Sequence, residues 1–185
     1  FYDPATQLLA GRAIGVSIDN SGTIAGEHND GVRLIGGGSV TNSGTISGTG
    51  AGGADGISMY AYDDQDISAL AAIGTIANAE TGAISGARYG AILFDGGAVE
   101  NDGTIAGGVG GLWIQGNQSE GTGKTASVPN AGTITGANGL TFANLLAPSE
   151  LANSGTINGT GRYGVTNGST GRASITNQTG GTITG

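Results

Sequence analysis

Apolar and polar residues alternate in short runs along this chain, and one run returns many times. Its fullest form is VTNSGTISG at residues 40–48, where an apolar residue, any residue and Asn are followed by Gly-Thr-Ile-x-Gly. Close copies begin at Ile18, Val99, Val128 and Leu151, and looser copies with two extra residues after the Asn begin at Ile76 and Ile175. Apolar side chains two residues apart are typical of half-buried strands, so the repeat predicts β-structure.

The central isoleucines give the period of the repeat. They are Ile24, Ile46, Ile84, Ile105, Ile134, Ile157 and Ile183, so successive units lie 22, 38, 21, 29, 23 and 26 residues apart. A unit of about 22 residues, lengthened by insertions near 61–74 and 116–127, is typical of a solenoid. We expect one β-helical segment over residues 13–185. Residues 1–12 carry no repeat and are a cap, a linker or the tail of a preceding unit.

Each unit predicts three short strands. The first ends at the Asn, the second is the Gly-Thr-Ile-x-Gly run, and the third follows a variable loop, as at residues 31–35, 56–60, 90–94, 111–115, 139–142 and 164–167. Strands this short cannot bury an apolar face alone, so each coil must stack on the next with parallel strands about 4.8 Å apart. The sequence therefore predicts an all-β fold, a parallel β-helix of about seven rungs. Helical spacing occurs weakly over residues 66–77, where we expect at most a decoration.

Asparagine occupies one fixed position in every unit. The seven residues are Asn20, Asn42, Asn78, Asn101, Asn130, Asn153 and Asn177. In stacked coils each amide can donate to one neighbouring rung and accept from the other, which satisfies polar groups at an inward corner. The alternative is that Asn merely tolerates a left-handed turn. Because Asp, Gly and Ser never replace it, we favour a structural ladder of Asn side chains.

Threonine precedes the central Ile in six units, and Ala83 takes its place in the seventh. Regular outward threonines raise the idea of ice binding. However, the outward position two residues later varies among Ala, Ser, Thr and Asn, so no flat Thr-x-Thr lattice is kept. The β-propensity of an exposed Thr is the preferred explanation.

Composition narrows the range of partners. Six Lys plus Arg against 14 Asp plus Glu give a net charge of −8, which argues against nucleic acid or an anionic membrane as the main partner. The chain has 185 residues and no Cys, so it has no disulfide framework. No apolar run approaches the roughly 20 residues of a membrane helix. The repeats continue to Gly185 without a polar closing unit, so we expect a segment of a longer chain or end-to-end stacking.

The repeated Asn-x-Gly-Thr-Ile-x-Gly motif, with a Gly-Ile-x-Leu-like strand between copies, resembles the passenger regions of bacterial autotransporters, the type V secreted proteins. The resemblance covers about residues 13–185. It implies a right-handed parallel β-helix displayed outside the outer membrane and attached to a translocator that lies outside this segment. Similar repeats occur in filamentous haemagglutinin-like adhesins. The Gly-Gly-x-Gly-x-Asp signature of calcium-binding nonapeptide repeats is missing.

Candidate chemistry is confined to a few places. No nucleophile elbow, zinc spacing or phosphate-binding loop occurs, and the single His28 is interpreted as a surface residue. The acidic loop of Asp63, Asp64 and Asp66 could hold Ca²⁺ through oxygen ligands or supply the acid pair of a glycosidase, but a solvated loop is the simpler interpretation. We therefore expect no firm metal site and no required cofactor.

A second candidate is the outward face of the third strands. Stacking of the rungs would bring Tyr60, Ile92, Phe94 and Trp113 together in one patch, beside the acidic loop. Such a patch is typical of a partner-binding surface or of a surface that a loop covers, and the insertion before Ile84 is the candidate cover. Aromatic rings beside carboxylates suit either a sugar or a basic protein surface.

Two classes of function remain. We favour a non-catalytic extracellular stalk or adhesin segment that mediates attachment to a host or matrix glycan or protein, or self-association of like chains. The alternative is a polysaccharide-degrading β-helix enzyme, a lyase or glycoside hydrolase. Enzymes on this fold need carboxylates clustered across adjacent rungs, whereas the acids here are scattered along the chain. Fold alone decides neither.

Overall fold

The computed structural model describes residues 15–50, 52–60, 74–116 and 124–185. Within these ranges the chain forms strands and turns and no helix. The first coil contains β1 (Val16–Asn20), β2 (Thr23–Gly26) and β3 (Val32–Ile35), and the second contains β4 (Gly38–Asn42), β5 (Thr45–Gly48) and β6 (Ile57–Tyr60). The third contains β7 (Thr75–Asn78), β8 (Ala83–Gly86) and β9 (Tyr89–Phe94), and the fourth contains β10 (Gly97–Asn101), β11 (Thr104–Gly107) and β12 (Gly110–Gln115).

The later coils have two strands each. The fifth contains β13 (Ala126–Asn130) and β14 (Thr133–Ala143), and the sixth contains β15 (Ser149–Asn153) and β16 (Thr156–Gly168). A partial seventh coil contains β17 (Ala173–Asn177) and β18 (Thr182–Thr184). The predicted second and third strands are thus continuous in β14 and β16. The intervening residues, 137–138 and 160–163, belong to these long strands, and the register of the pair shifts between Gly136 and Asn138.

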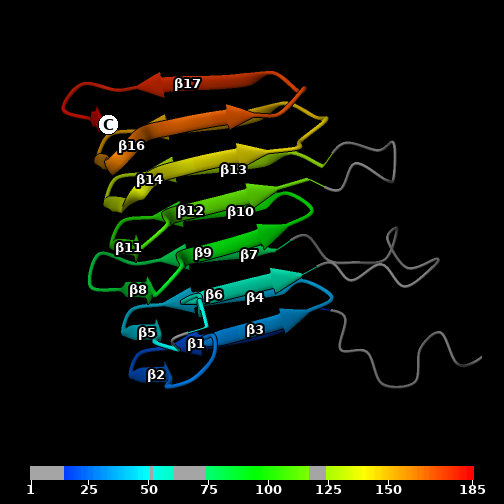
Figure 1. Cartoon of the computed structure of the whole chain (residues 1–185), viewed down its shortest axis with the longest axis vertical. Helices are drawn as coiled ribbons and strands as arrows, with labels where there is room; N and C mark the ends of the chain where they lie inside the picture. Colours follow the sequence, from blue (N-terminus) through cyan, green and yellow to red (C-terminus); the bar gives the residue numbers. More distant parts are fainter. Residues whose placement is uncertain (1–14, 51, 61–73, 117–123) are drawn as a thin grey trace, which may run out of the picture.

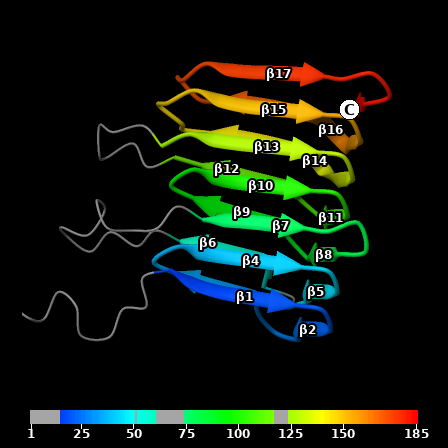
Figure 2. The ribbon, with the colours of Figure 1, turned by 180° about the vertical axis from the view of Figure 1, so that it is seen from behind.

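Equivalent strands of successive coils pair in parallel. The first strands form a seven-stranded sheet in the order β1-β4-β7-β10-β13-β15-β17, and the second and third strands lie in an 11-stranded sheet. The strand directions in two opposite views show the chain winding as a right-handed helix from β1 at one end to β17 at the other (Figures 1 and 2). The predicted parallel β-helix is confirmed, with about six complete turns of roughly 24 residues in place of seven turns of 22.

The central isoleucines form the predicted interior column. Ile46, Ile84, Ile105, Ile134 and Ile157 are paired in register along the sheet and are fully buried. A second interior column comes from the third strands, where Val32 pairs with Ile57 and Leu112 with Leu140. Burying each large aliphatic side chain contributes about 1.5–3 kcal/mol. Stacking of coils therefore supplies the core that one coil lacks.

Two boundaries differ from the sequence-based expectation. Thr75–Asn78 is strand β7 and pairs with β4 and β10. The helix considered over residues 66–77 is therefore wrong at its C-terminal end. Parallel pairing overrides a short helical pattern here because Ile76 is buried in the core. The second insertion ends at residue 125, since β13 begins at Ala126.

A glycine follows the Asn at the corners, where the backbone of the preceding coil approaches closely. A Cβ on Gly132 would overlap the carbonyl oxygen of Gly103 in the preceding coil. In the first described coil the equivalent Gly22 has nothing near the position of a Cβ. The tight corner is therefore a property of stacked coils and not of a single turn.

Candidate functional site

The Asn side chains form a continuous ladder of hydrogen bonds along the inside of one corner. Each Nδ2 donates to the Oδ1 of the next Asn, from Asn20 to Asn177, at 2.7–2.9 Å. Five of the seven, Asn42, Asn78, Asn101, Asn130 and Asn153, are almost completely buried. The predicted ladder is present, and every donor points toward the C-terminal end. Each amide also caps its own corner, as where Asn101 Nδ2 reaches the carbonyl of Gly103 at 3.3 Å.

The predicted aromatic face forms two columns on the third strands. In the first, Tyr60 and Phe94 stack with centroids 4.5 Å apart and planes 15° apart. The guanidinium of Arg33 lies 5.0 Å from the Tyr60 centroid. Arg33 belongs to the first coil and Phe94 to the third, so the two groups cover opposite faces of the Tyr60 ring. The Tyr60 ring is therefore already in contact with side chains of both neighbouring coils.

In the second column, Ile92 pairs with Trp113 and lies opposite Ser58. Ile92 is only 4% exposed, so it offers almost no surface to a partner. Trp113 meets Tyr89 edge to face, with centroids 5.2 Å apart, and its indole N–H is buried without a hydrogen-bond partner among the described residues. The four predicted residues share one face of the solenoid, where Tyr60, Phe94 and Trp113 are half-buried. The insertion considered as a cover for this face lies outside the described residues.

The loops that precede the third strands carry a polar network that the sequence analysis missed. Their described residues are 27–31, 49–50 with 52–56, and 87–88 in the first three coils. The backbone N–H of Gly31 donates to Asp55, and that of Arg88 donates to Ala54, so the loops stack like the strands. We call the side chains of Asp30, Asp55, Ser58 and Arg88 the clasp.

Asp55 is the centre of the clasp and is completely buried. Its Oδ1 accepts from Arg88 Nε at 3.0 Å and from the backbone N–H of Tyr89 at 3.1 Å. Its Oδ2 accepts from Arg88 Nη2 at 2.6 Å. A bidentate guanidinium pair of this kind is a strong, charge-assisted contact. The hydrogen bond to Asp55 raises the pKa of Arg88 above its usual range, and burial raises the pKa of Tyr89.

Asp30 extends the clasp into the first coil. Its Oδ1 accepts from the backbone N–H of Asp55 at 2.8 Å, and its Oδ2 lies 2.8 Å from Ser58 Oγ. The same hydroxyl lies 3.1 Å from Asp55 Oδ2. Because a serine hydroxyl has one proton, it can donate to only one of these carboxylates at a time. The clasp thus holds two carboxylates close together and one guanidinium beside them.

A polar pocket of about 230 Å³ opens over the clasp. It is lined by His28, Asn29, Asp30, Arg33, Gly52, Gly53, Ala54, Tyr60 and Arg88. The signal that could have indicated it is the Asp-Gly pair that directly precedes two successive third strands, at residues 30–31 and 55–56. The loop geometry decides which cation pairs with these aspartates, and the repeat motif does not encode that geometry.

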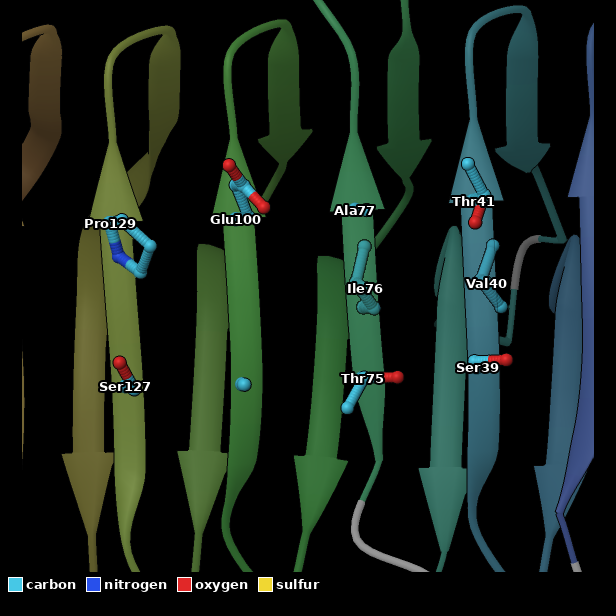
Figure 3. A pocket seen from close by; sticks show the side chains of 10 residues that line it. Ser39, Val40, Thr41, Thr75, Ile76, Ala77, Glu100, Ser127 and Pro129 are labelled. Atoms are coloured by element: carbon cyan, nitrogen blue, oxygen red, sulfur yellow. The ribbon is translucent and has the colours of Figure 1, made fainter.

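A second hollow, of about 240 Å³, lies on the outer face of the first sheet across β4, β7, β10 and β13 (Figure 3). Ala77 and Ala98 line it together with Thr41, Glu100 and Pro129. Its lining is mainly apolar and carries one charged side chain. The hollow follows from side-chain size along the sheet, so it is a weaker candidate than the pocket over the clasp.

The proposed acidic loop of Asp63, Asp64 and Asp66 lies outside the described residues. Within the described ranges, no group of three or more His, Cys, Asp or Glu side chains gathers in a way that could hold a metal ion. No helix long and apolar enough to cross a membrane occurs in the same part of the chain.

Comparison with protein-family models found no matching family, and searches of curated proteins and of solved structures found no match. The repeat motif and the geometry of the solenoid therefore carry the functional argument.

Proposed function

We propose that this chain is a non-catalytic segment of an extracellular β-helical stalk or adhesin, of the kind exported by bacterial autotransporters. The observation that carries the proposal is the uninterrupted stack of in-register coils, in which seven first strands follow one another along one axis. Six spacings of about 4.8 Å make a rod about 29 Å long. Such a rod can be lengthened by whole coils without altering its faces, which suits a spacer that carries binding sites away from a surface.

The ladder and the clasp add rigidity to that rod. Both join side chains from successive coils, so bending or unwinding one coil breaks hydrogen bonds to its neighbours. The net charge of −8 favours solubility outside a cell and disfavours non-specific attachment to anionic surfaces. Partners of this segment would be a glycan or protein of a host or matrix, or like chains. Attachment to an outer membrane would come from a translocator beyond this segment.

The alternative of a polysaccharide-degrading enzyme meets a specific obstacle. Asp30 and Asp55 form a close pair of carboxylates, as a glycosidase requires. However, Asp55 is fully buried and its oxygens are occupied by Arg88, Tyr89 and Ser58. Neither proton transfer to a glycosidic oxygen nor attack on a sugar ring is possible from that position without breaking the clasp. The pair therefore supports a structural role.

The two functions can be separated with protein-coated beads. Beads that carry the chain are applied to surfaces coated with polysaccharides and with matrix proteins, and the solution is assayed for new reducing or unsaturated ends. The proposal expects beads to be retained on at least one surface with no release of sugar. Release of reducing or unsaturated ends, abolished by Asp30→Asn, would establish an enzyme instead. Beads retained on none of the surfaces would refute the adhesin.

A further inference from the structure

The pocket over the clasp brings together several of the few basic residues of an acidic chain. The whole sequence has six Lys plus Arg and one His, against 14 acidic residues. Three of those seven basic residues, His28, Arg33 and Arg88, line this single pocket. Asp30 is the one acidic residue in its lining. Asp55 is completely buried and forms an ion pair with Arg88, so that pair carries no net charge together. Arg33 is the cation of the lining whose charge this pair does not offset.

The two arginines retain donors for a ligand. A guanidinium has five N–H groups, and Arg88 uses only its Nε and Nη2 atoms on Asp55. Arg33 is exposed and lies over Tyr60, and it forms no ion pair with any described residue. The side chain of Arg88 is 41% exposed, so both guanidinium groups can be reached from solvent. Paired guanidinium donors are the groups that recognise a planar carboxylate.

We propose that this pocket binds the carboxylate-bearing residue of an acidic saccharide, such as a uronate unit. The inference rests on the proposed function, and it adds the class of ligand and the site. Arg33 and Arg88 bind the carboxylate, and the remaining polar groups of the lining bind the hydroxyls. A volume of about 230 Å³ corresponds to about eight water molecules, which suits one sugar unit and is smaller than a typical drug-sized site.

Asp30 favours a sugar over an acidic peptide. Its carboxylate lies in the lining, where a bound anion brings negative charge close to it. A sugar unit carries hydroxyl donors next to its own carboxylate, and one of them can hydrogen-bond to Asp30 and offset the repulsion. The side chain of a Glu or Asp residue offers no such donor beside its charge. The amide of Asn29 and the hydroxyl of Tyr60 are further partners for hydroxyl groups.

The test measures binding of trigalacturonate to the full chain by isothermal titration calorimetry at low and physiological salt. Neutral galactotriose and a hexaglutamate peptide are the comparison ligands. The main variant is Arg33→Gln, which removes an exposed charge without touching the clasp. The matched control is Arg162→Gln, an equally exposed arginine in β16, three coils from Arg88. Thermal unfolding of each variant confirms that it is folded.

We expect trigalacturonate to bind at least tenfold more tightly than galactotriose or hexaglutamate. Arg33→Gln should weaken binding tenfold or more, whereas Arg162→Gln should change it less than twofold. Equal losses in both variants would show attraction by overall charge and overturn the site. Equal binding of hexaglutamate would overturn the saccharide, and no binding of trigalacturonate would overturn the inference.

These outcomes are distinct from those of the bead assay. Retention of beads that is unaffected by Arg33→Gln would leave the adhesin standing and refute this pocket as its site. Binding of trigalacturonate in solution, with no retention of beads on any surface, would support the pocket and refute the adhesin.

Discussion

Removal of one Asn from the middle of the ladder tests how the coils are held together. Asn101 is completely buried, accepts from Asn78 Nδ2 at 2.8 Å and donates to Asn130 Oδ1 at 2.7 Å. In Asn101→Ala the Asn130 oxygen loses its donor in a site closed to water, which costs about 1–3 kcal/mol. Asn78 Nδ2 keeps two carbonyl acceptors, so the loss of its third contact adds about 0.5–1.5 kcal/mol. We therefore expect a destabilisation of about 1.5–4.5 kcal/mol.

The measurement is urea unfolding, followed in parallel by circular dichroism and by fluorescence of Trp113, the only Trp. Coincident transitions with an unchanged slope would show that stability alone has changed. The control is Asn29→Ala, an exposed Asn in the loop before β3, where we expect a change within about 0.5 kcal/mol. Equal shifts of the midpoint for Asn101→Ala and Asn29→Ala would refute the ladder as a source of stability.

A second substitution at the same position tests the direction of the ladder. Asn101→Asp can still accept from Asn78, but it places an oxygen that cannot donate against the Asn130 oxygen. Burial raises the pKa of the new carboxyl above its unfolded value of about 3.9. The destabilisation should therefore be largest at neutral pH and should shrink as the pH falls and the carboxyl becomes protonated. A penalty that does not depend on pH would contradict this orientation of the amides.

Three further predictions follow from the corners and the clasp. Gly132→Ala should lower the melting temperature clearly, because its Cβ would overlap the Gly103 carbonyl, whereas Gly22→Ala should have little effect. Arg88→Gln should lower the free energy of unfolding in urea by about 1–3 kcal/mol, because it leaves the buried Asp55 carboxylate without its cation. The loss should be smaller than for a fully buried ion pair, because Arg88 is partly exposed. An unchanged urea midpoint would refute the clasp as a source of stability. Because the pKa of Tyr89 in the folded chain is raised above the ordinary tyrosine value of 10.0, the stability should fall as the pH rises above 10.0. Thermal melts across this pH range should show a smaller fall for Tyr89→Phe if this side chain is the cause.

The sequence predicted the parts of the fold that depend on repetition. The Ile column and the Asn ladder follow from equal positions in equal units, because parallel pairing brings like residues together. The merging of strands in β14 and β16 was not predicted, since the residues that continue each strand differ little from those that form a turn. The number of complete coils also depended on where insertions end.

The candidate site was predicted only in part. Tyr60, Phe94 and Trp113 were placed on the correct face, because two-residue alternation fixes which side chains point outward. The contact between Tyr60 and Arg33 was not predicted, because it depends on a side chain in the coil before it. The clasp was not predicted from the sequence, for a related reason. Asp55 and Arg88 are separated by 33 residues and meet through loops of unequal length.

Unequal loops also explain why a binding pocket can exist on so regular a rod. The Asn ladder runs along one corner of successive coils, with two extra residues after Asn78 and Asn177, and tight glycines exclude longer side chains from this corner. At the opposite end of the second strand, the connection shortens from residues 49–56 in the second coil to 87–88 in the third and is absent in β14. Residues of both long loops, His28 to Asp30 and Gly52 to Ala54, line the pocket. Arg88, in the short connection of the third coil, lines it as well. Transfer of the segment 49–56 to a later coil should leave the core intact and create a recess there without arginines, which would separate the contribution of shape from that of charge.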